Sequence, residues 1–417
     1  MPQTTSIRTS VVERFLRYVT YDTQSTEHSD TYPSTLKQLV LLDHLVEELK
    51  AVGLQDAVRD EHGYVMATIP ATSQKPVPVI GFIAHVDTSP EVSGANVRPI
   101  VHSNWQGEDI VLPDDPSVVL RVSEIPGLKE QIGHDIITAS GKTLLGSDNK
   151  SGVAAVVAAA EHLMQHLEIP HGAIRVGFTP DEEVGAGTRH FDVKKFGAKY
   201  AYTMDAAGRG SFEMETFSAD ACTVTFRGFN THPGFAKDKM VNSIKVAADF
   251  LQRLPRSGLS PETTWGREGF VHPYVLEGGV DSTSVRFIIR DFETAGLAQK
   301  EKQLEKLAQE AVAAWPGASA SVKVEESYRN MKEVLDQHPE VADYAREAIR
   351  RAGLEVRETA VRGGTDGSRL SFMGLPTPNI FAGENNFHSR LEWVSAQDME
   401  KSVETIVHLA QIWEERS

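Results

Sequence analysis

An apolar run that ends in polar residues decides the fold: Val77-Pro78-Val79-Ile80-Gly81-Phe82-Ile83-Ala84 leads directly into His85-Val86-Asp87. Two further apolar runs, at 173–178 and 201–204, also end in polar clusters. An Ala- and Val-rich stretch at 150–167 predicts a helix between the first two runs. Strands that alternate with helices predict an α/β sheet with parallel components. In such sheets ligands bind at the carboxyl ends of the strands, where the polar clusters stand here.

The rest of the chain predicts a catalytic domain that is interrupted by a second module. Helical spacing is found at 12–19, 35–52, 339–352 and 396–413, and short strands are expected at 358–361 and 379–381. Near residue 216 the pattern changes to strands at 222–226, 284–290 and 318–324, with helices at 243–254 and 297–315. We therefore expect a mixed, mainly parallel sheet with flanking helices, built from 1–215 and 328–417. An α+β, ferredoxin-like lid would occupy 216–327.

Charge and composition indicate which binding partners and which cellular compartment to expect. Among the 417 residues, 42 Lys and Arg stand against 58 Asp and Glu, so the net charge is 42 − 58 = −16. This excess argues against binding to nucleic acid or to anionic membranes. There is a single cysteine, Cys222, and residues 1–6 contain no apolar segment of the secretory type. We expect a cytoplasmic protein without a disulfide bond.

Several common catalytic motifs are missing. The sequence contains no G-x-G-x-x-G, Walker A, G-x-S-x-G or H-E-x-x-H pattern. What remains is a set of His, Asp and Glu residues at strand ends and helix starts. It consists of His85, Asp148, Glu183, Asp205 and His388. Each of them alone could be structural, but independent surface charges have no reason to gather at strand ends that one sheet brings together.

Charge arithmetic favours two metal ions at this set. Three carboxylates supply −3 and two neutral histidines supply none, so two divalent cations and one bridging hydroxide give a neutral site. Nitrogen and carboxylate ligands suit Zn²⁺, with Mn²⁺ or Co²⁺ as substitutes. Paired metals need a carboxylate that bridges them, and Asp148, mid-chain among the ligands and at a helix start, is the candidate.

Two neighbouring acidic residues predict separate roles for ligand and base. Successive side chains of an extended loop diverge, so of Glu182 and Glu183 one can bind metal while the other acts as general base on the attacking water. Asp87 lies two residues after His85 and can accept the second N–H of its imidazole.

These motifs resemble those of a known superfamily, the co-catalytic zinc peptidases and deacylases, which includes carboxypeptidase G2-like enzymes. The resemblance is carried by 85–88, 146–152 and 179–185, and further blocks are similar to its tripeptide aminopeptidases. Those blocks are Thr231–Gly234, Met240–Asn242, Ile288–Phe292, Arg362–Gly367 and Asn385–His388, together with Tyr21–Ser25. One departure is Ala206-Ala207, where the family usually has a pair of glycines after the aspartate.

The resemblance implies a role for each position. His85 and Asp205 would hold one metal, and Glu183 and His388 would hold the other. Asp148 would bridge the two metals. Glu182 would act as the general base, and Asp87 would accept the second N–H of His85. The implied substrate-binding residues are His232, Arg290 and Arg362. The resemblance also implies a cis peptide bond between Asp148 and Asn149.

We therefore expect a metal-dependent aminopeptidase that removes the N-terminal residue from tripeptides, by attack of a metal-bridging water. Two alternatives stay open: a related di-zinc deacylase or carboxypeptidase that acts on N-acyl amino acids or other short peptides, and a non-catalytic peptide-binding protein. The strands at 222–226 and 284–290 could offer an edge or a face for a homodimer through the lid.

Overall fold

The computed structural model describes residues 7–417. Residues 1–6, for which the sequence predicts no secretory signal, lie outside this part. The described chain forms two compact units. Among the described residues, unit 1 contains 7–214, 334–359 and 365–417, and unit 2 contains Glu215–Glu333 and Ala360–Gly364. The expected limits were 1–215, 216–327 and 328–417, whereas unit 2 runs from Glu215 to Glu333 and also includes the short stretch Ala360–Gly364.

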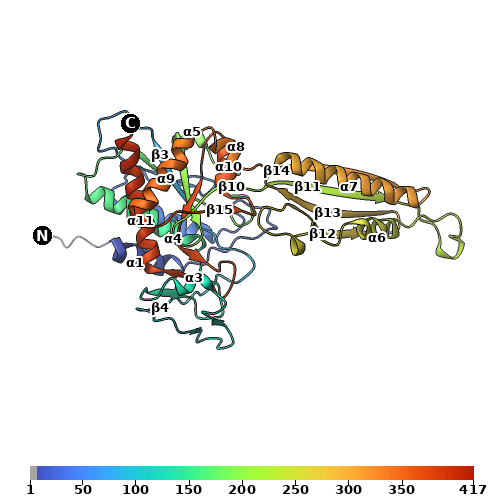
Figure 1. Cartoon of the computed structure of the whole chain (residues 1–417), viewed down its shortest axis with the longest axis horizontal. Helices are drawn as coiled ribbons and strands as arrows, with labels where there is room; N and C mark the ends of the chain where they lie inside the picture. Colours follow the sequence, from blue (N-terminus) through green and yellow to red (C-terminus); the bar gives the residue numbers. More distant parts are fainter. Residues whose placement is uncertain (1–6) are drawn as a thin grey trace. The chain divides into compact units, whose positions relative to one another are not determined.

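Unit 1 is built around one mixed sheet (Figure 1). Its strands follow the order β1-β2-β8-β3-β9-β16-β10-β15. The neighbours β8, β3, β9 and β16 are parallel, whereas β2 and β10 pair in the antiparallel sense. The strands are β1 (Val58–Arg59), β2 (Val65–Ile69), β3 (Ile80–His85), β8 (Ile174–Thr179), β9 (Tyr200–Ala206), β10 (Ser211–Thr216), β15 (Arg357–Val361) and β16 (Asn379–Phe381). The predicted α/β class with a mainly parallel centre is confirmed.

The helices of unit 1 flank this sheet, and one of them is almost entirely buried. They are α1 (Ile7–Tyr18), α2 (Gln38–Val52), α3 (Pro126–Lys129), α4 (Ser147–Gln165), α5 (Val193–Phe196), α9 (Pro339–Arg351), α10 (Asp366–Phe372) and α11 (Ala396–Glu415), and the short α8 (Lys332–Leu335) spans the boundary with unit 2. Helix α4 packs against β3 and β9 on one side and against α1 and α11 on the other. Its Ala and Val residues at 153–160 are all buried, since small side chains allow close approach on every side.

Two smaller antiparallel sheets complete unit 1. One has the order β17-β18-β7-β4 and the other consists of β5 and β6. Their strands are β4 (Ile100–His102), β5 (Ile110–Val111), β6 (Val119–Leu120), β7 (Ile136–Thr138), β17 (Glu384–Asn385) and β18 (Trp393–Ser395). Within residues 7–417 we find no helix with the length and apolar character that crossing a bilayer requires.

Unit 2 has the ferredoxin-like topology that the sequence predicts. Its strands are β11 (Ser218–Arg227), β12 (Phe270–Gly278), β13 (Ser282–Asp291) and β14 (Ser319–Tyr328), and its helices are α6 (Ser243–Arg253), α7 (Thr294–Ala314) and the short turns η1 (Pro233–Phe235) and η2 (Pro261–Thr263). The antiparallel sheet has the order β12-β13-β11-β14. Helices α6 and α7 pack on each other and on the two central strands, β11 and β13. Alternating residues such as Val224, Phe226 and Phe287 form the core beneath them.

Two expectations for unit 2 need correction. Strand β12 was not predicted, because Pro273 interrupts its pattern, and the pairing register with β13 shifts at that proline. The strands that we offered as a pairing edge are β11 and β13, which lie in the centre of the sheet. The edge alternative is therefore wrong for them, since both already have partners on each side, and the free edges belong to β12 and β14.

Candidate metal centre

Three parallel strands bring the predicted ligands to one edge of the unit 1 sheet. His85 is the last residue of β3, and Asp205 lies near the end of β9. In the pairing of these strands Ile83 faces Thr203, so His85 and Asp205 come two residues later on each strand. Glu183 follows β8, which is the other neighbour of β3. Because parallel neighbouring strands have their carboxyl ends at the same edge of the sheet, these three side chains lie close together.

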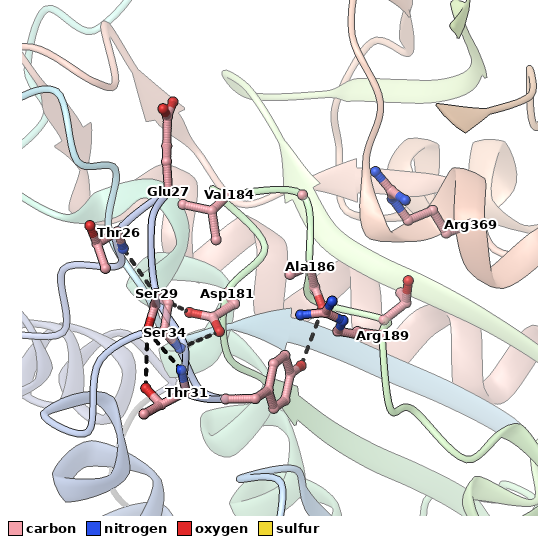
Figure 2. Close-up of a pocket in the computed structure, with 13 residues that line it drawn as sticks. Thr26, Glu27, Ser29, Thr31, Ser34, Asp181, Val184, Ala186, Arg189 and Arg369 are labelled. Carbon is pink, nitrogen blue, oxygen red and sulfur yellow. Dashed lines mark hydrogen bonds between the residues drawn. The ribbon is translucent and has the colours of Figure 1, made fainter. Parts of the chain in front are cut away.

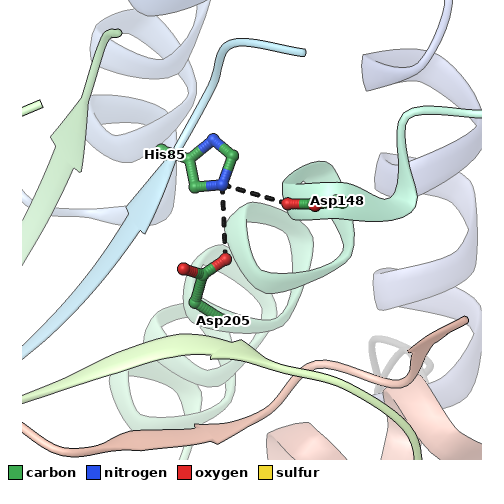
Figure 3. A group of neighbouring side chains, drawn as sticks. All are labelled: His85, Asp148 and Asp205. Carbon is green, nitrogen blue, oxygen red and sulfur yellow. Dashed lines mark hydrogen bonds and ion pairs between the residues drawn. The ribbon is translucent and has the colours of Figure 1, made fainter. Parts of the chain in front are cut away.

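The first ligand group joins His85 to two carboxylates (Figure 3). Its Nε2 lies 3.1 Å from Oδ1 of Asp148 and 3.3 Å from Oδ1 of Asp205. Burial by itself would lower the pKa of His85, but the charge of Asp205 and the hydrogen bonds to both carboxylates raise it well above its usual value. In the absence of a cation these carboxylates therefore favour the protonated imidazole, whose proton a metal ion would displace.

The second group is built in the same way around His388. Its Nε2 lies 2.7 Å from Oε2 of Glu183 and 3.2 Å from Oδ2 of Asp148. Burial opposes the charged form, yet the hydrogen bonds to Asp148 and Glu183 raise the pKa of His388 to about 11. Burial raises the pKa of Glu183 to about 8, and its Oε1 is buried without a hydrogen-bond partner. Such an orphaned oxygen next to an imidazole fits a cation site.

Asp148 belongs to both groups and offers a different oxygen to each. Burial alone would raise its pKa, but the hydrogen bonds from His388 and His85 hold it well below the usual range. The Asp148–Asn149 peptide bond is cis, as predicted. Two groups of one imidazole and two carboxylates, sharing one aspartate, have the donor composition expected for a pair of divalent metal ions.

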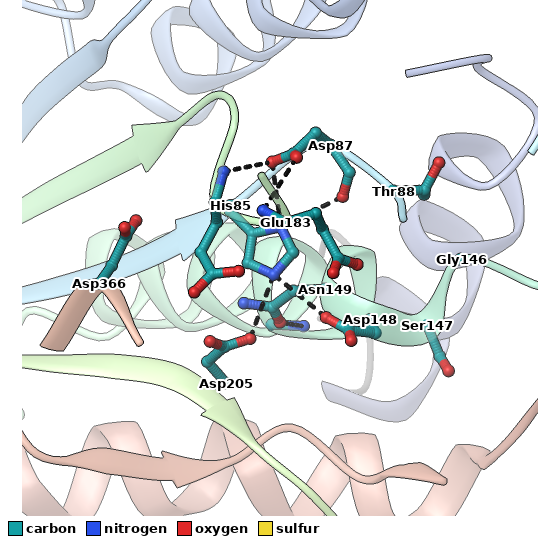
Figure 4. A network of polar contacts seen from close by, with 12 residues as sticks. His85, Asp87, Thr88, Gly146, Ser147, Asp148, Asn149, Glu183, Asp205 and Asp366 are labelled. Atoms are coloured by element: carbon teal, nitrogen blue, oxygen red, sulfur yellow. Dashed lines mark hydrogen bonds and ion pairs between the residues drawn. The ribbon is translucent and has the colours of Figure 1, made fainter. Parts of the chain in front are cut away.

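Asp87 has two functions, of which the sequence indicated one (Figure 4). Nδ1 of His85 lies 3.1 Å from the backbone oxygen of Asp87 and 3.3 Å from its Oδ1, close to the expected contact. The carboxylate of Asp87 also accepts hydrogen bonds from the backbone N–H groups of Glu182 (3.0 Å) and Glu183 (3.2 Å). Asp87 thus ties the strand end that carries His85 to the loop that carries both glutamates.

Glu182 lies among charges that alter its protonation. Burial raises the pKa of Glu182 well above its usual range, while His85 opposes this shift and Asp205 and Asp366 add to it. An upward pKa shift makes the carboxylate a stronger base, which suits a group that takes a proton from water.

Two buried carboxyl groups beside the site were not predicted. Asp366, at the start of α10, accepts a hydrogen bond from Oγ1 of Thr179 (3.0 Å), and burial raises its pKa to about 7. Glu384 is 2% exposed, and burial together with Asp148 and Asp205 raises its pKa well above the usual value. Asp366 lies in the block Arg362–Gly367, which could have drawn attention to it, whereas Glu384 follows no recognisable pattern.

The loop with the two glutamates is supported from its other side by residues 26–34 (Figure 2). Asp181 accepts hydrogen bonds from the backbone N–H and the hydroxyl of Ser34, both at 2.6 Å, and from Nε2 of Gln38 at 2.7 Å. The hydroxyl of Tyr32 donates to the backbone oxygen of Ala186 at 3.2 Å. These contacts border a hollow of about 390 Å³ and fix both ends of the segment 181–186.

The predicted substrate-binding residues all belong to unit 2. Arg290 donates from Nη1 to the backbone oxygen of Arg362 (3.0 Å), and both guanidinium groups lie over the ring of Phe270. Nε of Arg290 is buried without a hydrogen-bond partner. Arg362 donates to the backbone oxygens of Gly266 (2.6 Å) and Glu268 (2.9 Å), so its guanidinium group stabilises the loop at 266–268.

His232 is exposed and precedes the turn η1. Its Nδ1 accepts a hydrogen bond from the backbone N–H of Gly234 at 3.1 Å. This capping contact leaves Nε2 available as a donor.

Both the sequence and the fold of this chain are similar to those of known peptidases. The sequence model described as peptidase family M20/M25/M40 matches residues 145–412. A peptidase T of Clostridium botulinum is 48% identical over 406 residues, which cover 97% of this chain and 99% of that protein. The fold is similar to an aminopeptidase PepT from Bacillus cereus, with a TM-score of 0.75 and 22% identity over 98% of this chain and 99% of that one. It is also similar to a dinuclear metal-binding M20 peptidase from Bacillus subtilis, with a TM-score of 0.66, 14% identity, and 97% and 98% coverage.

Proposed function

The chain belongs to peptidase family M20/M25/M40, and we propose that it is a metal-dependent aminopeptidase that releases the N-terminal residue from tripeptides. The observation that carries this proposal is the position of Asp148, whose two oxygens lie 3.1 and 3.2 Å from the Nε2 atoms of two different histidines. The near full-length identity to peptidase T supports the substrate class.

The proposed metal centre uses His85 and Asp205 at one position, Glu183 and His388 at the other, and Asp148 between them. Zn²⁺ suits this nitrogen and carboxylate set, with Mn²⁺ and Co²⁺ as substitutes. When bound, two such ions polarise a scissile carbonyl and lower the pKa of the attacking water. Asp87 keeps His85 in place by contacts with Nδ1 and orders Glu182 through its backbone N–H.

Glu182 is the proposed general base. It would take the proton from water as the water oxygen attacks the carbonyl carbon, and would later give that proton to the nitrogen of the leaving peptide. The raised pKa of this buried carboxyl group supports this role, because a more basic carboxylate takes a proton from water more readily.

Two groups in unit 2 would act on the substrate. Nε2 of His232 could donate a hydrogen bond to the oxyanion of the tetrahedral intermediate. Arg290 could bind the peptide carboxylate, since its Nε has no partner and carboxylates pair well with guanidinium groups. Because this carboxylate would be bound at a fixed distance from the scissile bond, the enzyme would select peptides of one length.

A peptide panel tests this function. Purified protein with Zn²⁺ should cleave Ala-Ala-Ala at least tenfold faster than the dipeptide or the tetrapeptide of alanine, and should release the N-terminal residue. The N-acetylated tripeptide is the control and should not be cleaved. Preferential cleavage of N-acyl amino acids would favour a deacylase instead, and release of the C-terminal residue would favour a carboxypeptidase.

A further inference from the structure

A buried carboxylate outside the predicted ligand set holds the loop that carries Asp148. Glu392 is 1% exposed and directly precedes β18. Its Oε2 accepts hydrogen bonds from the backbone N–H groups of Leu145 (2.7 Å) and Gly146 (2.8 Å). Its Oε1 accepts from the hydroxyl of Ser147 (2.7 Å) and from the backbone N–H of Asp148 (3.0 Å). Each oxygen therefore binds two donors, and all four donors come from consecutive residues.

The backbone at 145–148 needs such a partner. Gly146 precedes α4 in a left-handed conformation (φ 83°) and has no side chain that could cap the helix. Asp148 (φ −81°, ψ 104°) and Asn149 (φ −121°, ψ 35°) are not helical either. Leu145, Gly146 and Ser147 are buried, so water cannot readily satisfy the N–H groups of Leu145 and Gly146 or the hydroxyl of Ser147. Buried N–H groups are nearly always paired, and here Glu392 supplies the acceptors.

We propose that Glu392 is a positioning residue that fixes Asp148 between the two metal positions. This inference rests on the metal centre of the proposed function. Asp148 must direct one oxygen to the side of His85 and the other to the side of His388, so a rotation of its backbone would weaken one of the two contacts. Glu392 is bonded to the Asp148 backbone and lies on the same short segment as His388. Glu392 thereby sets the distance between His388, a ligand of the second metal position, and the bridging Asp148.

The variant E392Q tests this role with little change in volume. An amide keeps one acceptor oxygen, but its NH₂ group would face two donors, so two of the four hydrogen bonds cannot form. Loss of a partner that orients a metal ligand typically costs tenfold to a hundredfold in metal affinity or activity. We expect E392Q to bind Zn²⁺ at least tenfold more weakly than the wild-type chain, measured on the full protein by competition with a chelator. The visible spectrum of the Co²⁺-loaded variant should also change.

A matched control separates positioning from stability. Glu48 on α2 is a carboxylate with three donors, namely Nε of Arg14 (2.8 Å), Nη2 of Arg17 (2.7 Å) and the hydroxyl of Tyr18 (2.7 Å). E48Q should lower the melting temperature but keep Zn²⁺ affinity within twofold of the wild type. If E392Q lowers the melting temperature yet binds Zn²⁺ with wild-type affinity and an unchanged Co²⁺ spectrum, the proposal is wrong.

A milder variant covers the case in which E392Q does not fold. S147A removes one of the four donors and should weaken Zn²⁺ binding in the same direction by a smaller factor, about threefold to tenfold. Wild-type affinity in S147A would then overturn the proposal. Zn²⁺ affinity can be measured without following the reaction. A chain that binds two ions but cleaves no tripeptide would contradict the proposed function, yet the Zn²⁺ affinities of the variants and the wild type could still be compared.

Discussion

Nε2 of His388 lies 2.7 Å from Oε2 of Glu183, although the two residues belong to opposite halves of the chain. Both also belong to a group that includes Asp148. The irregular segments that carry them follow β8 and β17. This contact completes the second ligand group of the site.

Glu182→Gln should separate proton transfer from metal binding. The amide has nearly the same shape but cannot accept a proton from water, so turnover should fall at least a hundredfold. Metal content, measured by elemental analysis, should stay at the wild-type value because Glu182 is not among the proposed ligands. Near-normal turnover in this variant would show that another group acts as the base.

Arg290→Ala should affect substrate binding more than chemistry. Removing the proposed partner of the peptide carboxylate should raise the KM for tripeptides at least tenfold and leave the metal content unchanged. Arg286, on the same strand, is a matched control, since its exposed guanidinium pairs with Glu277 at 2.9 Å. An unchanged KM in Arg290→Ala would remove this residue from the site.

His232→Ala should lower kcat rather than raise KM. An oxyanion donor acts mainly on the transition state, so its loss should reduce turnover at least tenfold while both metals stay bound. His272, on β12 of the same unit, provides the control substitution. If His232→Ala turns over at the wild-type rate, the residue only caps its turn.

Asp398 should make stability depend on pH. It is fully buried in α11, and burial raises its pKa to about 6, against the opposing charge of Arg209. Below pH 4 both folded and unfolded states are largely protonated. As pH rises toward 6, the unfolded chain releases this proton while the folded chain retains it, so stability falls across this window.

The variant Asp398→Asn lacks this titration. Relative to the variant, the wild type should lose about 2 kcal/mol of unfolding free energy between pH 4 and pH 7. Urea unfolding of both proteins at the two pH values measures the difference. A constant difference between the two proteins at both pH values would show that Asp398 keeps an ordinary pKa.

Regular segments explain why much of the site was predictable. His85 and Asp205 meet because β3 and β9 are parallel neighbours in register, and both strands are visible as apolar runs with polar ends. Strand β12 was missed because Pro273 breaks its pattern at an edge. Glu392 was missed for a different reason: its partners are backbone N–H groups of a distant, irregular loop, and no spacing in the sequence records such contacts.

In the proposed metal centre, Asp148 would share two divalent ions with His85 and Asp205 on one side and with Glu183 and His388 on the other. The most direct test of this arrangement is to strip the purified chain with a chelator and to follow tripeptide cleavage while Zn²⁺ is added back. The account predicts no cleavage without metal and a plateau at about two ions per chain, whereas His388→Ala should bind one ion tightly and stay nearly inactive. Cleavage that survives complete metal removal, or a fully active His388→Ala variant, would contradict it.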